Sequence, residues 1–457
     1  MVSVAALSFC SRLSLPVMRG AMCACSLVLA AKAGFAQPLP LSLNLDAAYA
    51  DTRAAMLAGD ADILCIGDSL TARPGAYFPF FSSRLRSRYG DGGEGYRAIS
   101  PWTGGTFDPN WSFGYINTDN WPYRSLDGMW AGIVTPTPTL GVISRFGPFA
   151  RIYYQTQPLG GTFSIERFNR PMTYVGTNAL AEGTASIDLD IDDMAPFGMR
   201  IRPYFTRVHA ELQRPTSEGP FIVYGAHWSS GQPGVRVHRA ANGGWGVDNF
   251  IRRGPSFTHI LQDINPDLII IMLGQNDGRY VPSLYASRYS ELLNRLQAEV
   301  PGAEIVIVTT YRSNINEVAN LAPAIFGVAQ QRGLGFINLR DAGGPYQSYV
   351  DRGYLDPDML HFNDAGGRFV ANLIFDALET GGASLASPCN DIDFNNNNVF
   401  PEDQDVIDFF DVLAGGTCPT ATGVQPGCDS IDFNRNGVYP EDQDIIDFFN
   451  VLAGAPC

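Results

Sequence analysis

Short, almost continuous apolar runs recur along the chain and predict buried strands. The five clearest are residues 62–66, 234–238, 267–273, 304–309 and 335–338. Runs without polar alternation are typical of strands that are covered on both faces, as in a parallel sheet. Residues 284–300 instead carry apolar side chains at three- and four-residue spacing, which predicts a helix, and another is predicted at about 365–378. The alternation predicts an α/β fold, a three-layer sandwich with about five parallel strands.

Residues 100–233 break this rhythm. They are rich in Gly, Pro, Thr and aromatic residues, and they contain short alternating stretches such as 150–154 and 186–191. Alternation with period two predicts strands with one buried face. We therefore expect an all-β sandwich inserted into an α/β domain that comprises residues 37–99 and 234–380. The alternative is a long irregular lid, but structureless loops of this length are rare in compact domains.

The first 36 residues have the pattern of a secretory signal. Arg12 and Arg19 precede an apolar run at 20–31, and small residues near Ala36 offer a cleavage site. The alternative is a membrane anchor, but the run is shorter than the roughly 20 residues that a spanning helix needs. We expect a secreted or extracytoplasmic protein without a transmembrane segment.

The C-terminal part contains an internal repeat. After a Gly/Ala/Ser-rich linker at residues 381–388, residues 389–418 align with residues 428–457. Each copy is bounded by two cysteines. We expect disulfide bonds among these four, which fits an oxidising compartment: Cys389, Cys418, Cys428 and Cys457. Cys65 lies inside an apolar run and is expected to be a buried, inert thiol.

Negative charge is concentrated in the repeats. Residues 389–457 hold 13 acids and one base, Arg435, in a chain whose net charge is −15. A surface of this sign repels phosphates, which excludes nucleic acid as a partner.

Polar motifs follow two of the predicted strands and precede the last helix. Gly67-Asp68-Ser69-Leu70 follows the first strand, a segment with Asn276 follows the third, and Asp358-Met359-Leu360-His361 precedes the helix. Side chains after parallel strands meet at the carboxyl edge of the sheet. Each motif alone also fits an ordinary structural role, because serine is a common helix cap and asparagine a common turn residue.

Asp358 and His361 are three residues apart, so both side chains can lie on one side of a turn. The carboxylate can then orient the imidazole, which can take a proton from Ser69. Asp356 is a rival acid, although its spacing from His361 fits less well.

Taken together and in this order, the motifs resemble the SGNH (GDSL-type) hydrolase family. A fourth block, residues 239–246, looks like the family's glycine block, with Gly244 as the matching glycine and Gly243 as the less favourable register. The resemblance covers about residues 55–380, interrupted by the insertion, and departs at Phe362, where many members have proline. It implies a flavodoxin-like α/β fold and an enzyme that hydrolyses esters through an acyl-serine.

The resemblance also implies a role for each site residue. Ser69 would be the nucleophile, His361 the base, and Asp358 the residue that orients the base. The oxyanion hole would consist of the backbone N–H groups of Ser69 and Gly244 and the side chain of Asn276; such a donor typically contributes a factor of about 10² to 10³ in rate. No cofactor is expected for catalysis.

Each C-terminal repeat opens like an EF-hand loop, with oxygen-bearing side chains at positions 1, 3 and 5. These are Asp393, Asn395 and Asn397 in the first repeat, and Asp432, Asn434 and Asn436 in the second. Position 12 is glutamine in both. The acids on either side of it are the candidates for the missing carboxylate: Asp405 and Asp444 one residue later, or Asp403 and Asp442 one residue earlier. The tandem resembles dockerin-type modules, which implies a small EF-hand-like helical tail that binds Ca²⁺ and docks to a partner or surface. An acidic, disulfide-closed repeat without metal is the alternative.

We expect a carbohydrate esterase that removes O-acetyl or similar short acyl groups from a polysaccharide. A lipase or general esterase acting on an acylated small molecule, or an acyltransferase, remains the alternative within the family. The non-enzyme alternative is a calcium-dependent glycan-binding surface protein, against which the intact motifs argue. Four tryptophans would either stack on sugar rings or fill the core: Trp111, Trp121, Trp130 and Trp228.

Overall fold

The computed structural model describes residues 39–453 with internal gaps. The gaps are 104–105, 108, 110, 115–124, 134–140, 144–146, 168–169, 192–198, 204, 208–214, 218–219, 315–320, 387–389, 391, 396–398, 400, 418–427, 429–430 and 434–439. The expected secretory signal lies outside the described residues. In the part of the chain that the structure describes, no helix combines the length and apolar character needed to cross a membrane.

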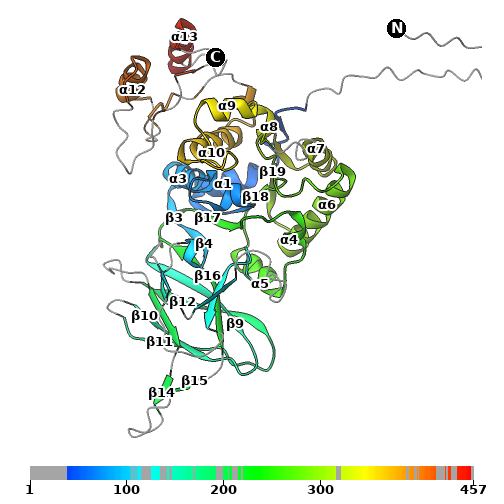
Figure 1. Cartoon of the computed structure of the whole chain (residues 1–457), viewed down its shortest axis with the longest axis vertical. Coiled ribbons are helices and arrows are strands. Elements are labelled where there is room, and N and C mark those ends of the chain that lie inside the picture. Colours follow the sequence, from blue (N-terminus) through cyan, green and yellow to red (C-terminus); the bar gives the residue numbers. More distant parts are fainter. Residues whose placement is uncertain are drawn as a thin grey trace, which may run out of the picture. The chain divides into compact units, whose positions relative to one another are not determined.

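A seven-stranded sheet forms the centre of the α/β domain (Figure 1). Its order is β1 (Ser42–Leu43), β20 (Gly335–Ile337), β19 (Glu304–Val308), β18 (Leu268–Met272), β2 (Asp60–Gly67), β17 (Gly234–Ala241) and β3 (Asp91–Gly93). All neighbours are parallel except β1, which pairs antiparallel with β20. The predicted α/β fold with a parallel sheet is confirmed, and the five predicted strands are all present.

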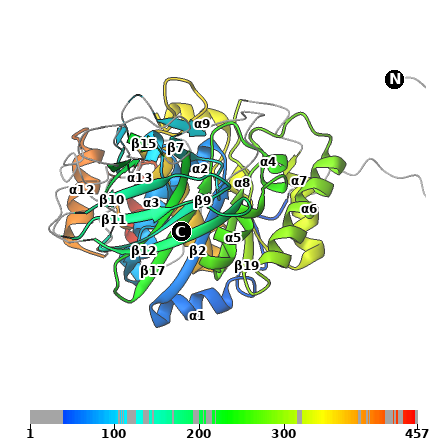
Figure 2. The ribbon, with the colours of Figure 1, turned by 90° about the horizontal axis from the view of Figure 1, so that it is seen from below.

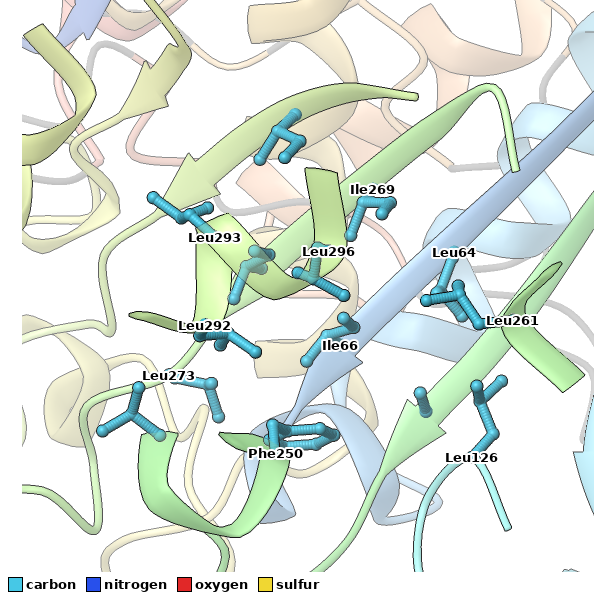
Figure 3. Packing of buried hydrophobic residues seen from close by; sticks show 14 of the residues in the cluster. Leu64, Ile66, Leu126, Phe250, Leu261, Ile269, Leu273, Leu292, Leu293 and Leu296 are labelled. Carbon is cyan, nitrogen blue, oxygen red and sulfur yellow. The ribbon is translucent and has the colours of Figure 1, made fainter. Parts of the chain in front are cut away.

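Helices cover both faces of this sheet. One face carries α4 (Val247–Ile251), α5 (Pro255–Ile264), α6 (Pro282–Glu299) and α7 (Leu321–Arg332); the other carries α1 (Ala50–Ala58), α3 (Tyr77–Tyr89) and α10 (Asp364–Glu379). Figure 2 shows α5, α6 and α7 grouped together. Alternate residues of a strand point to opposite faces of the sheet and pack against the two helix layers. Leu64 and Ile66 pack with Leu261, Leu292 and Leu296 (Figure 3), whereas Ile63 and Cys65 face the α3 and α10 side.

Cys65 is a free thiol in the second of these apolar layers. Burial raises its pKa to about 12, so it stays protonated and unreactive. This agrees with the expected inert thiol.

Strand order fixes where a site can form. The first long strand, β2, lies between β17 and β18, and the chain leaves it in opposite directions for the two halves of the sheet. In open α/β sheets, ligands bind at the carboxyl ends of the strands at such a reversal point. Ser69 follows β2 and Asn276 follows β18, so both lie at this edge.

Residues 106–229, which we call the β region, form two larger antiparallel sheets. One has the order β11 (Thr173–Gly176), β10 (Thr162–Glu166), β13 (Met199–Pro203), β8 (Gly141–Ile143) and β5 (Thr106–Phe107). The other has the order β12 (Gly183–Asp190), β9 (Phe149–Thr156), β16 (Phe221–Ser229), β7 (Trp130–Ile133) and β6 (Ser112–Gly114), with β4 (Gly95–Ala98) also paired to β16. A separate pair joins β14 (Phe205–Arg207) and β15 (Pro215–Ser217). Side chains from both larger sheets share one apolar core, for example Phe163 and Ile152.

Two of the tryptophans, Trp111 and Trp228, belong to this core, whereas Trp130 belongs to the apolar layer that contains Leu64 and Ile66. Trp111, Trp130 and Trp228 are only 5%, 5% and 1% exposed. Of the two alternatives for these residues, filling the core is the one observed, because the protein covers their indole rings. Trp121 lies outside the described residues.

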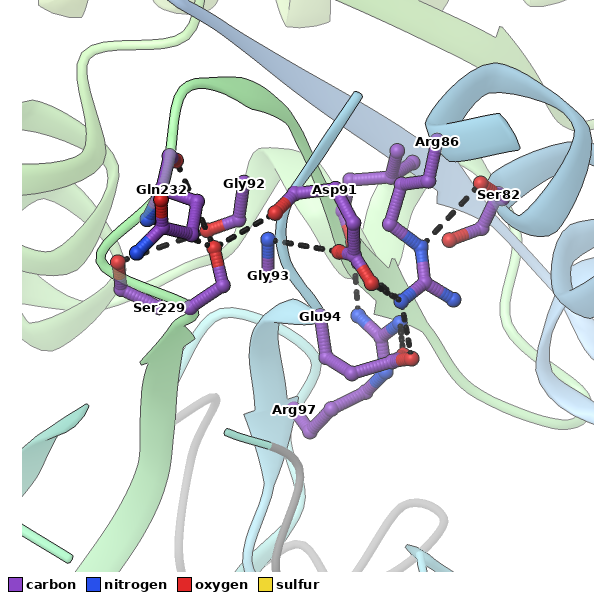
Figure 4. Close-up of polar contacts among 11 residues, drawn as sticks. Ser82, Arg86, Asp91, Gly92, Gly93, Glu94, Arg97, Ser229 and Gln232 are labelled. Atoms are coloured by element: carbon purple, nitrogen blue, oxygen red, sulfur yellow. Dashed lines mark hydrogen bonds and ion pairs between the residues drawn. The ribbon is translucent and has the colours of Figure 1, made fainter. Parts of the chain in front are cut away.

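Polar contacts fix the place where the chain passes between the central sheet and the β region (Figure 4). Arg86 of α3 lies 2.6 Å from the Glu94 carboxylate, which Arg97 of β4 approaches at 2.7 Å. On the returning chain, the Ser230 N–H donates to the Gly92 carbonyl at 2.9 Å. The outgoing and returning segments are thus tied to each other beside β3.

The C-terminal repeats form two matching helices, α12 (Asp403–Leu413) and α13 (Asp442–Leu452). The rings of Phe409 and Phe448 stack with centroids 4.2 Å apart, and Phe394 and Phe433 complete a buried cluster. Part of the segment expected to be a flexible linker instead forms the short helix α11 (Ala383–Ala386), because Leu385 is buried against α10.

Candidate active site

A tight turn after β2 presents Ser69. The strand ends at Gly67, and the short helix α2 (Ser69–Ala72) begins at Ser69. The Asp68 carboxylate caps this helix by accepting from the Leu70 N–H at 2.9 Å. A Cβ at Gly67 would lie 2.0 Å from Thr71 Oγ1, so only glycine fits there. Ser69 therefore stands at the carboxyl edge of the sheet, with 9% of its surface exposed.

The turn before α10 brings Asp358 and His361 to Ser69. His361 Nε2 lies 2.8 Å from Ser69 Oγ, and His361 Nδ1 lies 2.7 Å from Asp358 Oδ2. Asp358 Oδ1 accepts from the backbone N–H groups of Leu360 and His361 at 3.0 and 2.9 Å. With Nδ1–H donating to the carboxylate, Nε2 is left as the acceptor for the serine proton.

The Asp358 carboxyl is held in its charged form. Its partial burial alone would raise the pKa, but hydrogen bonds from the His361 backbone, the His361 ring and Arg73 hold the pKa well below its usual range. The rival acid, Asp356, instead extends its carboxylate towards Arg73, at 3.5 Å. Asp358, and not Asp356, is therefore the acid that contacts the imidazole ring of His361.

Aromatic packing supports this turn from behind. Phe362 is 1% exposed and contacts the rings of Tyr311 and Tyr349. The Tyr311 hydroxyl also donates to the Leu360 carbonyl at 2.6 Å. Phenylalanine at this position therefore anchors the His361 turn by burying an aromatic ring.

Gly244 and Asn276 lie in the loops that follow β17 and β18, the strands on either side of β2. Gly244 has a φ of +73°, a conformation that favours glycine, and a Cβ there would meet no atom within 4 Å. The Asn276 side chain donates to the Trp245 carbonyl at 2.9 Å, which ties the two loops together. An amide NH₂ has two hydrogens, so a second donor remains for a bound oxyanion.

Several polar residues near the site have no clear signal in the sequence. Burial, with the charge of Asp277 adding to it, raises the pKa of Asp68 to about 7. Burial likewise raises the pKa of Asp277 to about 6, although its carboxylate accepts from the Val247 N–H. Arg73 Nη1 donates to Asp358 Oδ2 at 2.9 Å. Arg73 stands four residues after Ser69, but this spacing alone does not distinguish it from other surface arginines.

The structure describes part of the expected calcium ligand set. Asp393, Asn395 and Asp405 of the first repeat are each buried, and the Asn395 N–H donates to Asp405 Oδ1 at 3.4 Å. Burial, with the nearby Asp393 carboxylate adding to it, raises the pKa of Asp405 to about 7. Such a cluster of buried carboxyl and amide oxygens fits a Ca²⁺ ion, whose charge would offset the repulsion.

The second repeat is similar in its described residues. Asp432 and Asp444 are both buried, and Arg352 lies 3.2 Å from Asp432. Cys428 is disulfide-bonded. The remaining candidate ligands and cysteines lie outside the described residues: Asn397, Asn434, Asn436, Cys389, Cys418 and Cys457.

A second group of possible ligands, Asp62, His227 and His238, lies at the opposite, amino end of β2. His238 Nδ1 accepts from the Tyr96 N–H, so Nε2 keeps its proton and donates to Asp62 at 2.8 Å. Arg236 donates to both oxygens of Asp62. The proton and the guanidinium occupy the places that a metal would need, so the cluster is an ion-pair network.

Comparison with known proteins agrees with this fold. Residues 210–369 match the model of the GDSL-like Lipase/Acylhydrolase family. A solved structure described as a peptidoglycan O-acetylesterase in action has a TM-score of 0.59 and 18% identity, covering 76% of this chain and 100% of that one. No curated protein matches the chain.

Two other solved structures match with lower scores. A Bacillus subtilis protein has a TM-score of 0.31 and 14% identity, covering 69% of this chain and 98% of that one. A family two carbohydrate esterase from Cellvibrio japonicus has a TM-score of 0.20 and 15% identity, covering 52% and 84%. These scores are too low to support an argument. The family match is confined to residues 210–369 and does not reach Ser69, and the first solved structure, the peptidoglycan O-acetylesterase, shows a similar fold.

Proposed function

We propose that this protein is a secreted serine esterase in which Ser69 is the nucleophile. The observation that carries the proposal is the continuous path from Ser69 Oγ through the His361 ring to Asp358, with contacts of 2.8 and 2.7 Å. A serine hydroxyl is a weak nucleophile unless an adjacent base takes its proton. The geometry supplies that base and a carboxylate to hold it.

The reaction has two halves. Ser69 Oγ attacks the ester carbonyl while its proton passes to His361 Nε2, and the tetrahedral intermediate then expels the alcohol, which receives that proton. Water next attacks the acyl-serine, again giving a proton to His361. Collapse releases the carboxylic acid and returns the proton to Ser69. Asp358 stabilises the imidazolium in both halves.

We assign the oxyanion hole to the Ser69 and Gly244 N–H groups and the Asn276 side chain. The hydrogen bond from Asn276 to the Trp245 carbonyl supports this assignment, because it holds the amide in one orientation before substrate arrives. Preorganised donors of this kind stabilise negative charge without reorganisation during the reaction.

For the substrate we propose an O-acetyl or similar short acyl ester on a polysaccharide. The fold neighbour acts on O-acetyl groups of peptidoglycan, which makes acetylated glycans the first class to test. We further propose that the β region is an inserted sandwich and that it shapes access to Ser69. Its shared core between two sheets supports the sandwich.

For the C-terminal repeats we propose Ca²⁺ binding and docking to a partner or surface. Asp393, Asn395 and Asp405 would hold the first ion. Export fits both the signal-like N-terminus and the disulfide at Cys428.

Hydrolysis of p-nitrophenyl esters of increasing chain length tests this function. We expect the wild type to prefer acetyl over long acyl chains and the Ser69→Ala variant to lose activity. Acetate release from a panel of acetylated glycans would then identify the polysaccharide. Transfer of the acyl group to an added alcohol in preference to water would point to an acyltransferase, and equal rates for wild type and variant would reject the proposal.

A further inference from the structure

Arg73 joins the serine helix to the Asp358–His361 turn. It ends α2, and its backbone N–H donates to the Ser69 carbonyl at 3.2 Å. Its side chain reaches the other component of the site, where Nη1 donates to Asp358 at 2.9 Å. One residue is therefore bonded to the nucleophile's backbone and to the carboxylate that orients the base.

Arg73 contacts one particular oxygen of the Asp358 carboxylate, Oδ2. Asp358 Oδ1 is engaged by backbone N–H groups, whereas Oδ2 accepts from both His361 Nδ1 and Arg73 Nη1. Arg73 thus shares the oxygen on which the imidazole depends. A positive charge there draws electron density from that oxygen and weakens its stabilisation of a second positive charge on His361.

The adjoining loop keeps Arg73 in place. A Cβ at Gly75 would lie 2.7 Å from the Phe362 carbonyl oxygen, so the chain just after Arg73 packs directly on the residue that follows His361. A cavity of about 530 Å³ opens beside this contact and is lined by Arg73, Asp356 and Asp364, among others. Arg73 keeps 41% of its side chain exposed and is therefore open to solvent on this side.

From this geometry we propose that Arg73 is a positioning residue for the catalytic pair, one that extends the pH range of activity towards acid. It fixes the Asp358 carboxylate relative to Ser69, and its charge disfavours protonation of His361, so that the base stays free at lower pH. The proposal rests on the proposed esterase function.

Other charged or titratable groups surround the pair and must stay constant in any test. Those that contact the turn or line the cavity are Tyr311, Tyr346, Asp356 and Asp364.

The test compares pH profiles of kcat/KM on p-nitrophenyl acetate for wild type, Arg73→Met and Arg73→Lys. In the methionine variant we expect the acidic limb to move to higher pH by about 0.5–1 unit, because the imidazolium gains stability. In Arg73→Lys we expect the acidic limb to lie at the wild-type pH, since lysine keeps the positive charge. Arg288→Met is the matched control: its side chain is also 41% exposed and also forms a 2.9 Å ion pair, with Glu291 on α6.

A purely structural role for Arg73 predicts a different result. Activity would then fall equally at every pH with the limb unmoved, and that outcome would overturn the proposal. A proton NMR titration of the His361 ring, assigned by loss of its signal in His361→Asn, gives a readout that needs no turnover. An unchanged midpoint in Arg73→Met would overturn the proposal even if the protein proved not to be an esterase, whereas an inactive wild type with a shifted midpoint would count only against the esterase function.

Discussion

His361 Nε2 lies 2.8 Å from Ser69 Oγ, although 292 positions separate the two residues in the sequence. Between them the chain builds the β region and five strands of the central sheet. The contact is made by β2, which ends just before Ser69, and by the turn that precedes α10. The contact therefore depends on the fold of the whole α/β domain. Substitution of the residues around it should have measurable effects on activity or stability.

The two acids of the His361 turn should differ sharply. Asp358→Asn would present an amide to His361 Nδ1, which favours the wrong tautomer, and kcat should fall by about 10³–10⁴-fold. Asp356→Asn, two residues away, should leave kcat within about twofold, because its exposed ion pair with Arg73 is weak. Steady-state kinetics on p-nitrophenyl acetate check the pair, and equal losses in both variants would contradict the assignment of Asp358.

Asn276 should matter to the transition state more than to substrate binding. In Asn276→Ala we expect kcat to fall by about 10²–10³-fold with little change in KM, because a donor to the oxyanion is lost. Asn294→Ala, on the outer helix α6, is the control and should behave like wild type. A rise in KM at unchanged kcat would show that Asn276 contacts the ground state instead.

Much of the architecture could be predicted because it depends on apolar patterning. Strands β2, β17, β18, β19 and β20 were visible as apolar runs, since each is covered by helices on both faces. The alternating stretch at 150–154 lies in β9, and the stretch at 186–191 begins in β12 and ends one residue past it; the two strands pair with each other. The edge strand β3, Asp91–Gly93, carries no apolar signal, because it is held by backbone pairing and polar contacts.

The site was predictable only as far as its motifs extend. The motifs identified Ser69, Asn276, Asp358 and His361, and the structure brings His361 into direct contact with both Ser69 and Asp358. Arg73 was missed because a half-exposed arginine looks like any surface charge until its partner is known. The burial of Asp68 and Asp277 was also hidden, because acids are rarely buried and the loops that cover them are distant in sequence.

The buried Asp277 predicts a pH dependence of stability. Its pKa of about 6 exceeds the usual value near 4, so the folded state binds the extra proton and loses stability as pH rises between these values. The side chain in Asp277→Asn cannot ionise, so the stability of this variant lacks that pH dependence. The free energy of unfolding of the variant minus that of wild type should therefore be larger at pH 7.5 than at pH 4.5, by about 1–3 kcal/mol. Urea unfolding at the two pH values measures this, and a difference between variant and wild type that is independent of pH would contradict it.

The repeats should respond to calcium. If Asp393 and Asp405 hold an ion, adding CaCl₂ to EDTA-treated full-length protein should raise the melting temperature of the repeats, because an ion that binds only the folded state stabilises it. Calorimetry should show the shift in wild type and in the exposed-acid control Asp411→Asn, but not in Asp405→Asn. The same melting profile in calcium and in EDTA would reject the metal site.

Covalent labelling of Ser69 tests the central claim most directly. A fluorophosphonate reacts with an activated serine, displaces fluoride and leaves a stable adduct that peptide mass spectrometry can locate. We predict one adduct per chain, on the peptide that contains Ser69, with activity lost in proportion to labelling and no adduct in Ser69→Ala. Full inactivation with the label on another residue, or hydrolysis by Ser69→Ala at the wild-type rate, would contradict the account.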